Sequence, residues 1–487
     1  MSLKQKTIHG LTWSFIDSFT SSGFSFIVGI ILARILSPRE FGLIGMITIF
    51  IAVSQSFIDS GFSNALIRKK DCKQEDFSTV FYFNIFISLI FTGILIIAAP
   101  KISDFFKEPE LNLLVQVLSI GLIINAFGII QRTIFIKNID FKKQTKISII
   151  ASLGSGIIAL TMAYSGFGVW SLVALTLSKY FLNSLFFWIW SSWKPEFVFS
   201  KKSFRELFCF GSKILVSGLI DTIYRNVYYL VIGKFFNAQE LGYYTRADQF
   251  QTLPSSNLND VITRVSFPVL SSIQDEPERL MNNYKKLIRS TMFITFVLML
   301  GMAAVAKSMI LVLIGEKWLP SVIYLQLLCL VGMFYPLHAL NLNMLQIKGR
   351  SDLFLRLEII KKILAIPIIA IGIFCGIIPM IVGMIINTII AYYLNSYWSG
   401  KLIGYSFLEQ IKDILPGFFI ASIMAFIIFI ISLFITTRPL ILLLIQIGIG
   451  VTSLIILCEL IKFKDYIYIK QLIIDKLTSL KTKKDGK

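Results

Sequence analysis

Residues 78–99 read STVFYFNIFISLIFTGILIIAA, a run of 22 residues without a charged side chain. A helix that crosses the hydrocarbon core of a bilayer needs about 20 consecutive, mostly apolar residues. Charged residues bound the run, with Asp76 before it and Lys101 after it. The stretch therefore predicts a membrane-spanning helix, and the same pattern recurs along the chain.

The same length requirement predicts about fourteen transmembrane helices and an all-α polytopic membrane protein. The first of these segments is too long for the apolar core of a signal peptide, so we expect it to remain as a span. The predicted spans lie near residues 11–33, 41–67, 78–99, 111–136, 147–164, 168–190, 207–232, 240–270, 290–314, 321–346, 357–375, 377–398, 414–436 and 439–461.

The composition excludes a soluble chain. Hydrophobic residues make up 55% of the 487 residues and charged residues only 15%, whereas soluble proteins carry about a quarter charged residues. A formal net charge of +19 would suggest nucleic-acid binding in a soluble protein. Here the basic residues lie in short loops between apolar runs, which is typical of membrane proteins. We expect no nucleic-acid partner.

The sequence offers no catalytic or metal-binding constellation. The five cysteines are scattered, and His9 and His338 are the only histidines, so we expect no metal site, no disulfide framework and no cofactor. The longest loops between predicted spans, 191–206 and 271–289, are basic and hold no cluster of acid and base groups. We therefore expect no enzymatic activity.

Basic residues predict the orientation, because Lys and Arg accumulate in cytoplasmic loops. If the N-terminus is cytoplasmic, 33 basic residues fall on the cytoplasmic side and 7 on the other side, and 7 more lie inside spans. This asymmetry predicts a multi-pass membrane protein with both termini in the cytoplasm.

Two loops indicate an internal repeat. Residues 34–42 read RILSPREFG and residues 234–242 read KFFNAQELG, so their basic, Glu and Gly positions coincide at an offset of 200. Each copy contains six predicted spans, an even number, which predicts two bundles related by a pseudo-two-fold axis along the membrane normal. Short Gly-containing loops can also match by chance. The predicted divisions are a first bundle at 1–200, a second at 201–405, an extra helix pair at 406–465 and a basic cytoplasmic tail at 466–487.

Ionisable residues inside spans are costly and usually face a bundle interior or a wet cavity. Lys179, Asp221 and Arg225 lie mid-span, where they are too deep to extend to the membrane surface. Asp221 and Arg225 belong to a stripe of polar residues spaced four apart on one helix face. The span near 240–270 is unusually polar and contains Arg246, Asp260 and Arg264, with Pro254 in its middle. We predict that these six ionisable residues line a central substrate cavity: Arg225, Arg246, Asp221, Lys179, Arg264 and Asp260.

An alternative interpretation is structural, because Asp and Arg four residues apart neutralise each other on a helix. It applies to Asp221 with Arg225 and to Asp260 with Arg264. Asp17 and Asp59, in apolar surroundings of the first repeat, are candidates for proton or sodium coupling. Hydrogen bonds to neighbouring hydroxyl or amide groups are the alternative explanation for these two carboxylates.

Several segments also resemble a known family. The segments are LARILSPREFG at 32–42, DSGFSNALI at 59–67, LGYYTRADQ at 241–249, RVSFPVLS at 264–271, QDEPER at 274–279, GEKW at 315–318 and KGRSD at 348–352. Together they resemble the Wzx-type polysaccharide flippases of the multidrug/oligosaccharidyl-lipid/polysaccharide exporter superfamily, over nearly the whole chain.

The resemblance implies a flippase that moves an undecaprenyl-diphosphate-linked oligosaccharide, a lipopolysaccharide or exopolysaccharide repeat unit, from the cytoplasmic to the periplasmic leaflet by alternating access. Its partners would be the polyprenyl-diphosphate-linked glycan, membrane lipid and a polysaccharide polymerase or ligase, and it would function as a monomer. A flippase for the peptidoglycan precursor and a cation-coupled drug exporter are the alternatives. The basic residues Arg225 and Lys179 argue against the drug exporter, which would favour an acidic, aromatic pocket.

Overall fold

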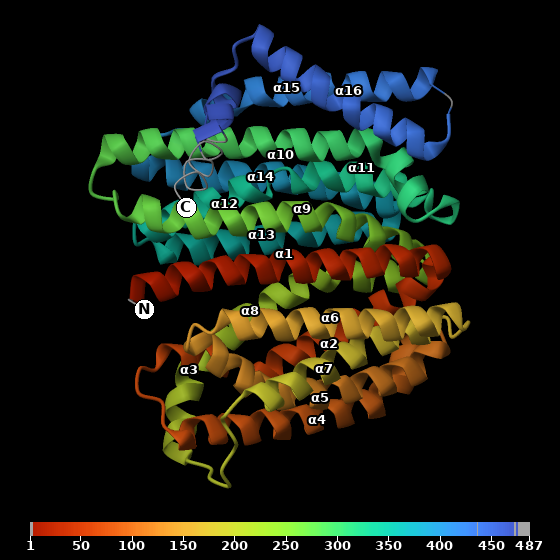
Figure 1. The fold of residues 1–487 in the computed structure, drawn as a ribbon, viewed down its shortest axis with the longest axis vertical. Coiled ribbons are helices and arrows are strands. Elements are labelled where there is room, and N and C mark those ends of the chain that lie inside the picture. The colour runs from red at the N-terminus through yellow and green to blue at the C-terminus, as the bar shows by residue number, and fades with distance from the viewer. Residues whose placement is uncertain (1–2, 436, 472–473, 476–487) are drawn as a thin grey trace, which may run out of the picture. The chain divides into compact units, whose positions relative to one another are not determined.

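The chain is helical throughout the part that the structure describes. The computed structural model describes residues 3–435, 437–471 and 474–475, apart from the side chains of residues 3–12, 14–19, 260–261 and 264–265. Every regular element within these residues is a helix (Figure 1). This confirms the prediction of an all-α chain.

The contacts divide the chain into two compact units. Unit 1 is Met1–Thr245 and unit 2 is Arg246–Lys487. Unit 1 holds α1 (Leu3–Ile35), α2 (Pro38–Asp59), α3 (Phe62–Arg68), α4 (Gln74–Phe106), α5 (Glu110–Lys137), α6 (Phe141–Tyr164), α7 (Trp170–Trp190), α8 (Lys201–Phe235) and the first turns of α9 (Ala238–Ser271).

Unit 2 contains the rest of α9 and the helices that follow it. These are α10 (Pro277–Leu313), a 3₁₀ turn at Glu316–Trp318, α11 (Ser321–Gly332), α12 (Tyr335–Ile347), α13 (Ser351–Cys375), α14 (Ile377–Ile403), α15 (Phe407–Phe434) and α16 (Pro439–Leu460). Within this unit, α10 packs along α15, α13 along α14, and α16 against both α10 and α15.

Among the described residues, eleven helical segments are long and apolar enough to cross a membrane. They are Pro38–Arg68, Gln74–Phe106, Glu110–Lys137, Phe141–Tyr164, Trp170–Trp190, Lys201–Phe235, Pro277–Leu313, Ser321–Ile347, Ile377–Ile403, Phe407–Phe434 and Pro439–Leu460. A polytopic membrane protein is therefore confirmed. The predicted spans near 11–33, 240–270 and 357–375 lie in α1, α9 and α13, which are outside this set.

The reasons differ among these three helices. In α1, the apolar stretch with described side chains is Thr20–Ile35, which is too short by itself to belong to this set. Polar side chains run through most of α9, which nevertheless continues as one helix past Pro254 and Pro268. The first half of α13 carries charged residues at five positions, namely Asp352, Arg356, Glu358, Lys361 and Lys362.

Glycines mark two of the boundaries between helices. Gly166 and Gly168 have φ of 81° and 55°, and they separate α6 from α7 where the sequence predicted a break. The predicted span at 41–67 is instead interrupted: Ser60 and Gly61 have φ of 46° and 71° and end α2 before α3 begins. The left-handed region is readily accessible to glycine, so Gly61 permits a sharp change of direction that apolar content alone does not reveal.

Helix α8 packs along α2 within unit 1. Small residues allow their backbones to approach closely: a Cβ added to Gly61 would lie 2.5 Å from the carbonyl oxygen of Gly211, and one added to Gly211 would lie 2.7 Å from that of Ser60. In the last turn of α2, the hydroxyl of Ser56 lies 3.2 Å from that of Thr222 in α8. The sequence predicts that α8 begins the second bundle. In the structure, α8 packs against helices of the predicted first bundle.

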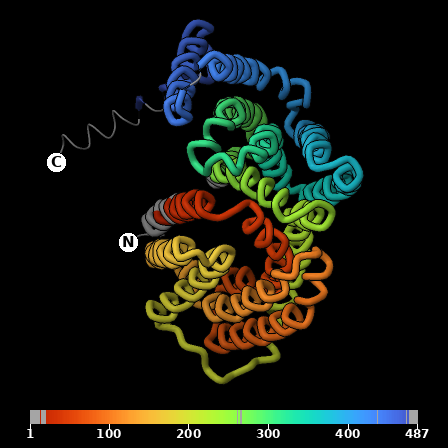
Figure 2. Tube along the Cα trace, turned by 90° about the vertical axis from the view of Figure 1, so that its right-hand side faces the viewer, coloured from red at the N-terminus to blue at the C-terminus, as the bar shows by residue number. Residues whose placement is uncertain are grey.

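The segment between α7 and α8, residues 191–200, is extended and crosses the end of unit 1 (Figure 2). It is fixed to the first turns of α4, because the backbone N–H of Glu196 donates to Ser78 Oγ at 3.0 Å and that of Ser200 donates to Thr79 Oγ1 at 2.9 Å. We call residues 191–200 the strap.

Candidate functional site

The polar stripe of α8 is an exposed feature of unit 1. Arg225 Nε lies 2.8 Å from Asp221 Oδ2, so the ion pair that their spacing predicts is present. The pair is not covered by protein, since the Arg225 side chain is 76% exposed and that of Asp221 45% exposed. Lys213 and Ser217 continue the stripe and are exposed as well. The arrangement leaves guanidinium N–H groups available to a ligand while Asp221 holds the side chain in place.

Lys179 of α7 contacts α1. Its Nζ lies 3.4 Å from the hydroxyl of Ser25, and one turn earlier on α1 the hydroxyl of Ser21 lies 3.3 Å from that of Ser152 in α6. Ser21 and Ser25 of α1 therefore face α6 and α7 within unit 1. Lys179 is half-buried, and its ammonium group is placed between helices.

The two carboxylates proposed for ion coupling lie on different helices of unit 1. Asp59 is the last residue of α2, and its Oδ1 accepts a hydrogen bond from Ser63 Oγ. Thr133 Oγ1 in α5 donates in turn to Ser63 Oγ at 3.1 Å. Asp17 lies in α1, and its side chain is outside the described residues. For Asp59, the hydroxyl groups of Ser63 and Thr133 therefore fit the hydrogen-bonding explanation.

The polar residues of α9 belong mostly to unit 2. Arg246 Nη1 donates to Gln249 Oε1 at 2.6 Å, and Gln251 Nε2 donates to Ser255 Oγ at 2.9 Å. Gln251 is buried against α11, where a Cβ added to Gly332 would lie 1.7 Å from its Nε2. The side chains of Asp260 and Arg264 are outside the described residues, so their predicted pairing stays a prediction.

The structure thus brings some of the predicted residues together within unit 1. Asp221 and Arg225 form a pair, and Lys179 contacts Ser25 of α1. Arg246 begins the second unit. No group of three or more His, Cys, Asp or Glu side chains within the described part of the chain could hold a metal ion. The arrangement suits recognition of an anionic or polar ligand by cationic donors.

A buried polar network in unit 2 was not predicted. Ser399 Oγ donates to Asn341 Oδ1 at 2.5 Å, and Asn341 Nδ2 lies 3.4 Å from Gln410 Oε1. All three side chains are fully buried, and they connect α12, α14 and α15. The available signal was the presence of uncharged polar residues within apolar helices, and such residues attract less attention than a charge.

Comparison with known proteins gives the family. The polysaccharide biosynthesis protein family matches residues 31–323, which is more than half of the chain. The chain therefore belongs to this family, and the resemblance predicted from its motifs is confirmed.

Curated relatives agree with that assignment. The lipopolysaccharide biosynthesis protein WzxC of Escherichia coli K12 is 29% identical over 81% of this chain and 82% of its own length. The teichuronic acid biosynthesis protein TuaB of Bacillus subtilis 168 is 27% identical over 72% and 73%, respectively. The succinoglycan biosynthesis transport protein ExoT of Rhizobium meliloti 1021 is 26% identical over 63% and 62%.

Solved structures share the fold. The lipid II flippase MurJ, in an inward closed conformation, matches with a TM-score of 0.77 at 19% identity, over 94% of this chain and all of that one. An inward-facing multidrug resistance MATE family transporter matches with a TM-score of 0.61 at 15% identity, over 78% and 95%. At these identities the likeness concerns the fold and not the substrate.

Proposed function

We propose that this chain is a flippase for a lipid-linked oligosaccharide, moving a polyprenyl-diphosphate-linked repeat unit from the cytoplasmic to the periplasmic leaflet by alternating access. Family membership and relatives named for lipopolysaccharide, teichuronic acid and succinoglycan biosynthesis support it. The membrane location follows from the apolar helices. The substrate's diphosphate and sugars need a polar route through the bilayer, whereas its prenyl tail can remain in lipid.

The observation that carries the proposal is the exposed Arg225. It lies within the apolar helix α8 with 76% of its side chain uncovered. An arginine facing lipid at the centre of a span costs about 2.5–3.5 kcal/mol or more, so a water-filled cavity is the favourable environment. The planar guanidinium group matches phosphate oxygens with paired hydrogen bonds. Arg225 would bind the diphosphate there, with Asp221 orienting it.

The proposal extends to the full transmembrane arrangement. We infer fourteen spans by adding α1, α9 and α13 to the eleven apolar segments, because polar helices occur in transporters where they line a cavity. Two six-helix bundles would be related by an axis along the membrane normal, followed by the pair α15 and α16. Both termini would lie in the cytoplasm of a bacterial cell, and the protein would act as a monomer beside a polysaccharide polymerase or ligase.

Reconstitution tests the function. The purified chain is placed in liposomes with the undecaprenyl-diphosphate-linked oligosaccharide extracted from the host cells, and a membrane-impermeant glycosidase reports how much glycan reaches the outer leaflet. We expect the accessible fraction to exceed that of protein-free liposomes and of liposomes with a double Asp221→Asn, Arg225→Gln variant. Equal accessibility in all three preparations would overturn the proposal.

A further inference from the structure

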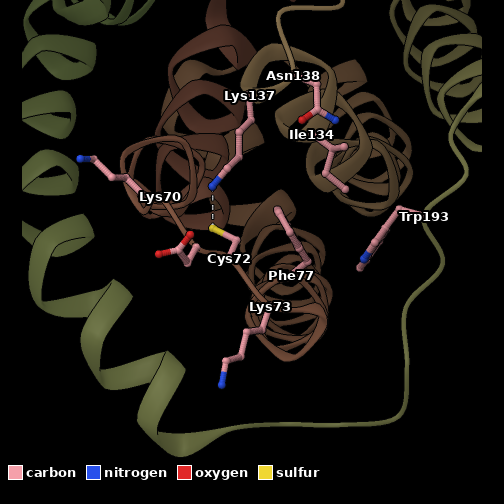
Figure 3. A pocket seen from close by; sticks show the side chains of 9 residues that line it. Lys70, Cys72, Lys73, Phe77, Ile134, Lys137, Asn138 and Trp193 are labelled. Atoms are coloured by element: carbon pink, nitrogen blue, oxygen red, sulfur yellow. Dashed lines mark hydrogen bonds between the residues drawn. The ribbon is translucent and has the colours of Figure 1, made fainter.

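A cavity of about 430 Å³ opens at the end of unit 1 where α4 begins (Figure 3). The loop after α3, the end of α5 and the strap surround it. Its lining includes Lys70, Lys73, Lys137, Asn138, Phe77 and Trp193. One side of the cavity is therefore basic and the other aromatic.

Two basic side chains at this end, Lys69 and Arg68, already have partners. Lys69 Nζ lies 3.1 Å from Asp76 Oδ1 and 3.0 Å from Glu206 Oε2. Desolvation lowers the pKa of Lys69, but the hydrogen bonds to Glu206 and Asp76 outweigh it and hold the pKa above its ordinary value. The guanidinium group of Arg68 lies 4.3 Å from the ring centre of Phe210.

Lys137 has a structural task of its own. Its Nζ donates to the carbonyl oxygens of Leu66, at 2.7 Å, and of Lys69, both at the end of α3. Figure 3 shows the same amino group directed at Cys72 Sγ, 2.7 Å away. Its partners are neutral, so Lys137 closes the helix end while its charge stays uncompensated inside the cavity.

The other two lysines of the cavity lining are Lys70 and Lys73. Both are exposed, and neither has an ion-pair partner among the described residues. Their amino groups point outward on long, flexible side chains (Figure 3), which can turn toward a ligand at the cavity mouth. Asp71 is the one acidic residue of the lining. With Lys70, Lys73 and Lys137 it gives a net charge of +2, which favours an anion.

The aromatic side is rigid. Trp193 Nε1 donates to Gln74 Oε1 at 2.6 Å, and the rings of Trp193 and Phe77 meet edge to face with centres 6.2 Å apart. Phe197, also on the strap, is 98% exposed. Trp193 lies beside lysines, and Trp is enriched at the membrane–water interface, which favours a position of the cavity at the level of lipid headgroups.

We propose that this cavity binds the phosphate group of a membrane lipid on the cytoplasmic side. Basic pockets between transmembrane helices on that side recognise lipid phosphates, and Phe77 with Trp193 would cover the first part of the acyl or prenyl chain. The site is separate from the α8 stripe and does not depend on which glycan the protein moves. Either an anionic phospholipid or the polyprenyl diphosphate can supply the phosphate.

Native mass spectrometry of the delipidated full-length protein tests the site. The ligands are phosphatidylglycerol, phosphatidylcholine, undecaprenyl diphosphate and inorganic phosphate. We expect a Lys70→Gln, Lys73→Gln double variant to bind phosphatidylglycerol about thirtyfold more weakly, since each lysine near a lipid surface contributes about fivefold. The matched control is Lys201→Gln with Lys202→Gln, which removes the same charge from exposed positions outside the lining.

A loss confined to the cavity variant supports the proposal, and the ligand that is lost first identifies the source of the phosphate. An equal loss in both double variants would reduce the effect to general surface charge and overturn it. Displacement of the lipid by inorganic phosphate at equal concentration would overturn the lipid part. Unfolding temperatures in detergent guard against misfolding: both double variants should unfold at the wild-type temperature, because all four lysines are exposed.

Discussion

Gly42 of α2 lies directly against Ala238 at the start of α9: a Cβ atom added to Gly42 would stand 1.6 Å from the Ala238 carbonyl oxygen. The relationship is reciprocal, because a Cβ added to Gly242 would stand 1.9 Å from the carbonyl oxygen of Pro38. Positions 38 and 238, like 42 and 242, differ by the offset of 200 at which the loop repeats. A two-fold axis makes contacts of this kind, which supports the proposed relation between the two repeats.

Gly42→Ala tests the importance of this contact. The added methyl group has no room, so α2 and the start of α9 must separate; overpacking of this kind costs about 1–3 kcal/mol. We expect a lower unfolding temperature in detergent and reduced export. Gly218→Ala in α8 is the control, because nothing lies within 4 Å of the Cβ that it adds. Equal unfolding temperatures for the two variants would contradict a tight contact at Gly42.

The buried network of unit 2 gives a second stability prediction. Ser399→Ala removes the hydroxyl that donates to Asn341 Oδ1, and a buried acceptor left without its partner costs about 1–3 kcal/mol. Ser272→Ala is the control, since Ser272 is exposed and its hydroxyl bonds only the nearby backbone of Val269. Thermal unfolding in detergent should show a clear drop for Ser399→Ala alone. A similar drop in both would point to a general effect of losing serine.

Much of the fold was accessible from the sequence because bilayer thickness imposes a length on apolar segments. The stretch at 78–99 lies within α4, and the Gly166–Gly168 break falls between α6 and α7. Positions of uncharged polar residues were less informative. Asn341 and Ser399 lie 58 residues apart in the chain, and nothing in a periodic pattern indicates that they meet.

The site could be predicted only as far as single helices allow. Asp221 and Arg225 pair because four residues make just over one helical turn. The contact of Lys179 with Ser25 depends on how α7 and α1 are rotated against each other, which the sequence does not specify. Lys70 and Lys73 belong to one predicted cytoplasmic loop and Lys137 to another, and Lys137 also closes the end of α3. These lysines line one cavity only because the chain turns between α3 and α4.

The orientation can be tested with reporters. Lys107 follows the last residue of α4, so a fusion after Lys107 does not interrupt the helix. We expect a reporter at Lys107 to lie in the periplasm and one at the C-terminus in the cytoplasm, because basic residues accumulate on the cytoplasmic side. Alkaline phosphatase and green fluorescent protein fusions distinguish the two sides. The same side for both positions would eliminate the fourteen-span arrangement.

Asp17 and Asp59 remain proposed sites of proton or sodium coupling. Asparagine removes the charge and keeps an oxygen that accepts a hydrogen bond, so we expect Asp17→Asn or Asp59→Asn to flatten the pH or sodium dependence of export. Ser63→Ala is the converse control at Asp59, because it removes the hydrogen bond and keeps the charge. Unchanged pH and sodium profiles in both Asn variants would exclude coupling through these carboxylates.

Arg225 provides the most direct prediction about the transported lipid. Arg225→Ala alone is ambiguous, because it leaves Asp221 without the cation 2.8 Å away and can lower stability as well as ligand binding. A double Asp221→Asn, Arg225→Gln variant removes both charges together and keeps similar volumes and hydrogen-bonding groups. We expect it to reach normal membrane levels but to lose at least tenfold in flipping rate, because a bidentate, charge-assisted contact with phosphate is absent. Arg225→Lys should rescue the rate only in part, since an ammonium group cannot form the planar pair of bonds. If the double variant flips substrate at the wild-type rate, Arg225 is a structural residue, and Arg246 of α9 becomes the next residue to test.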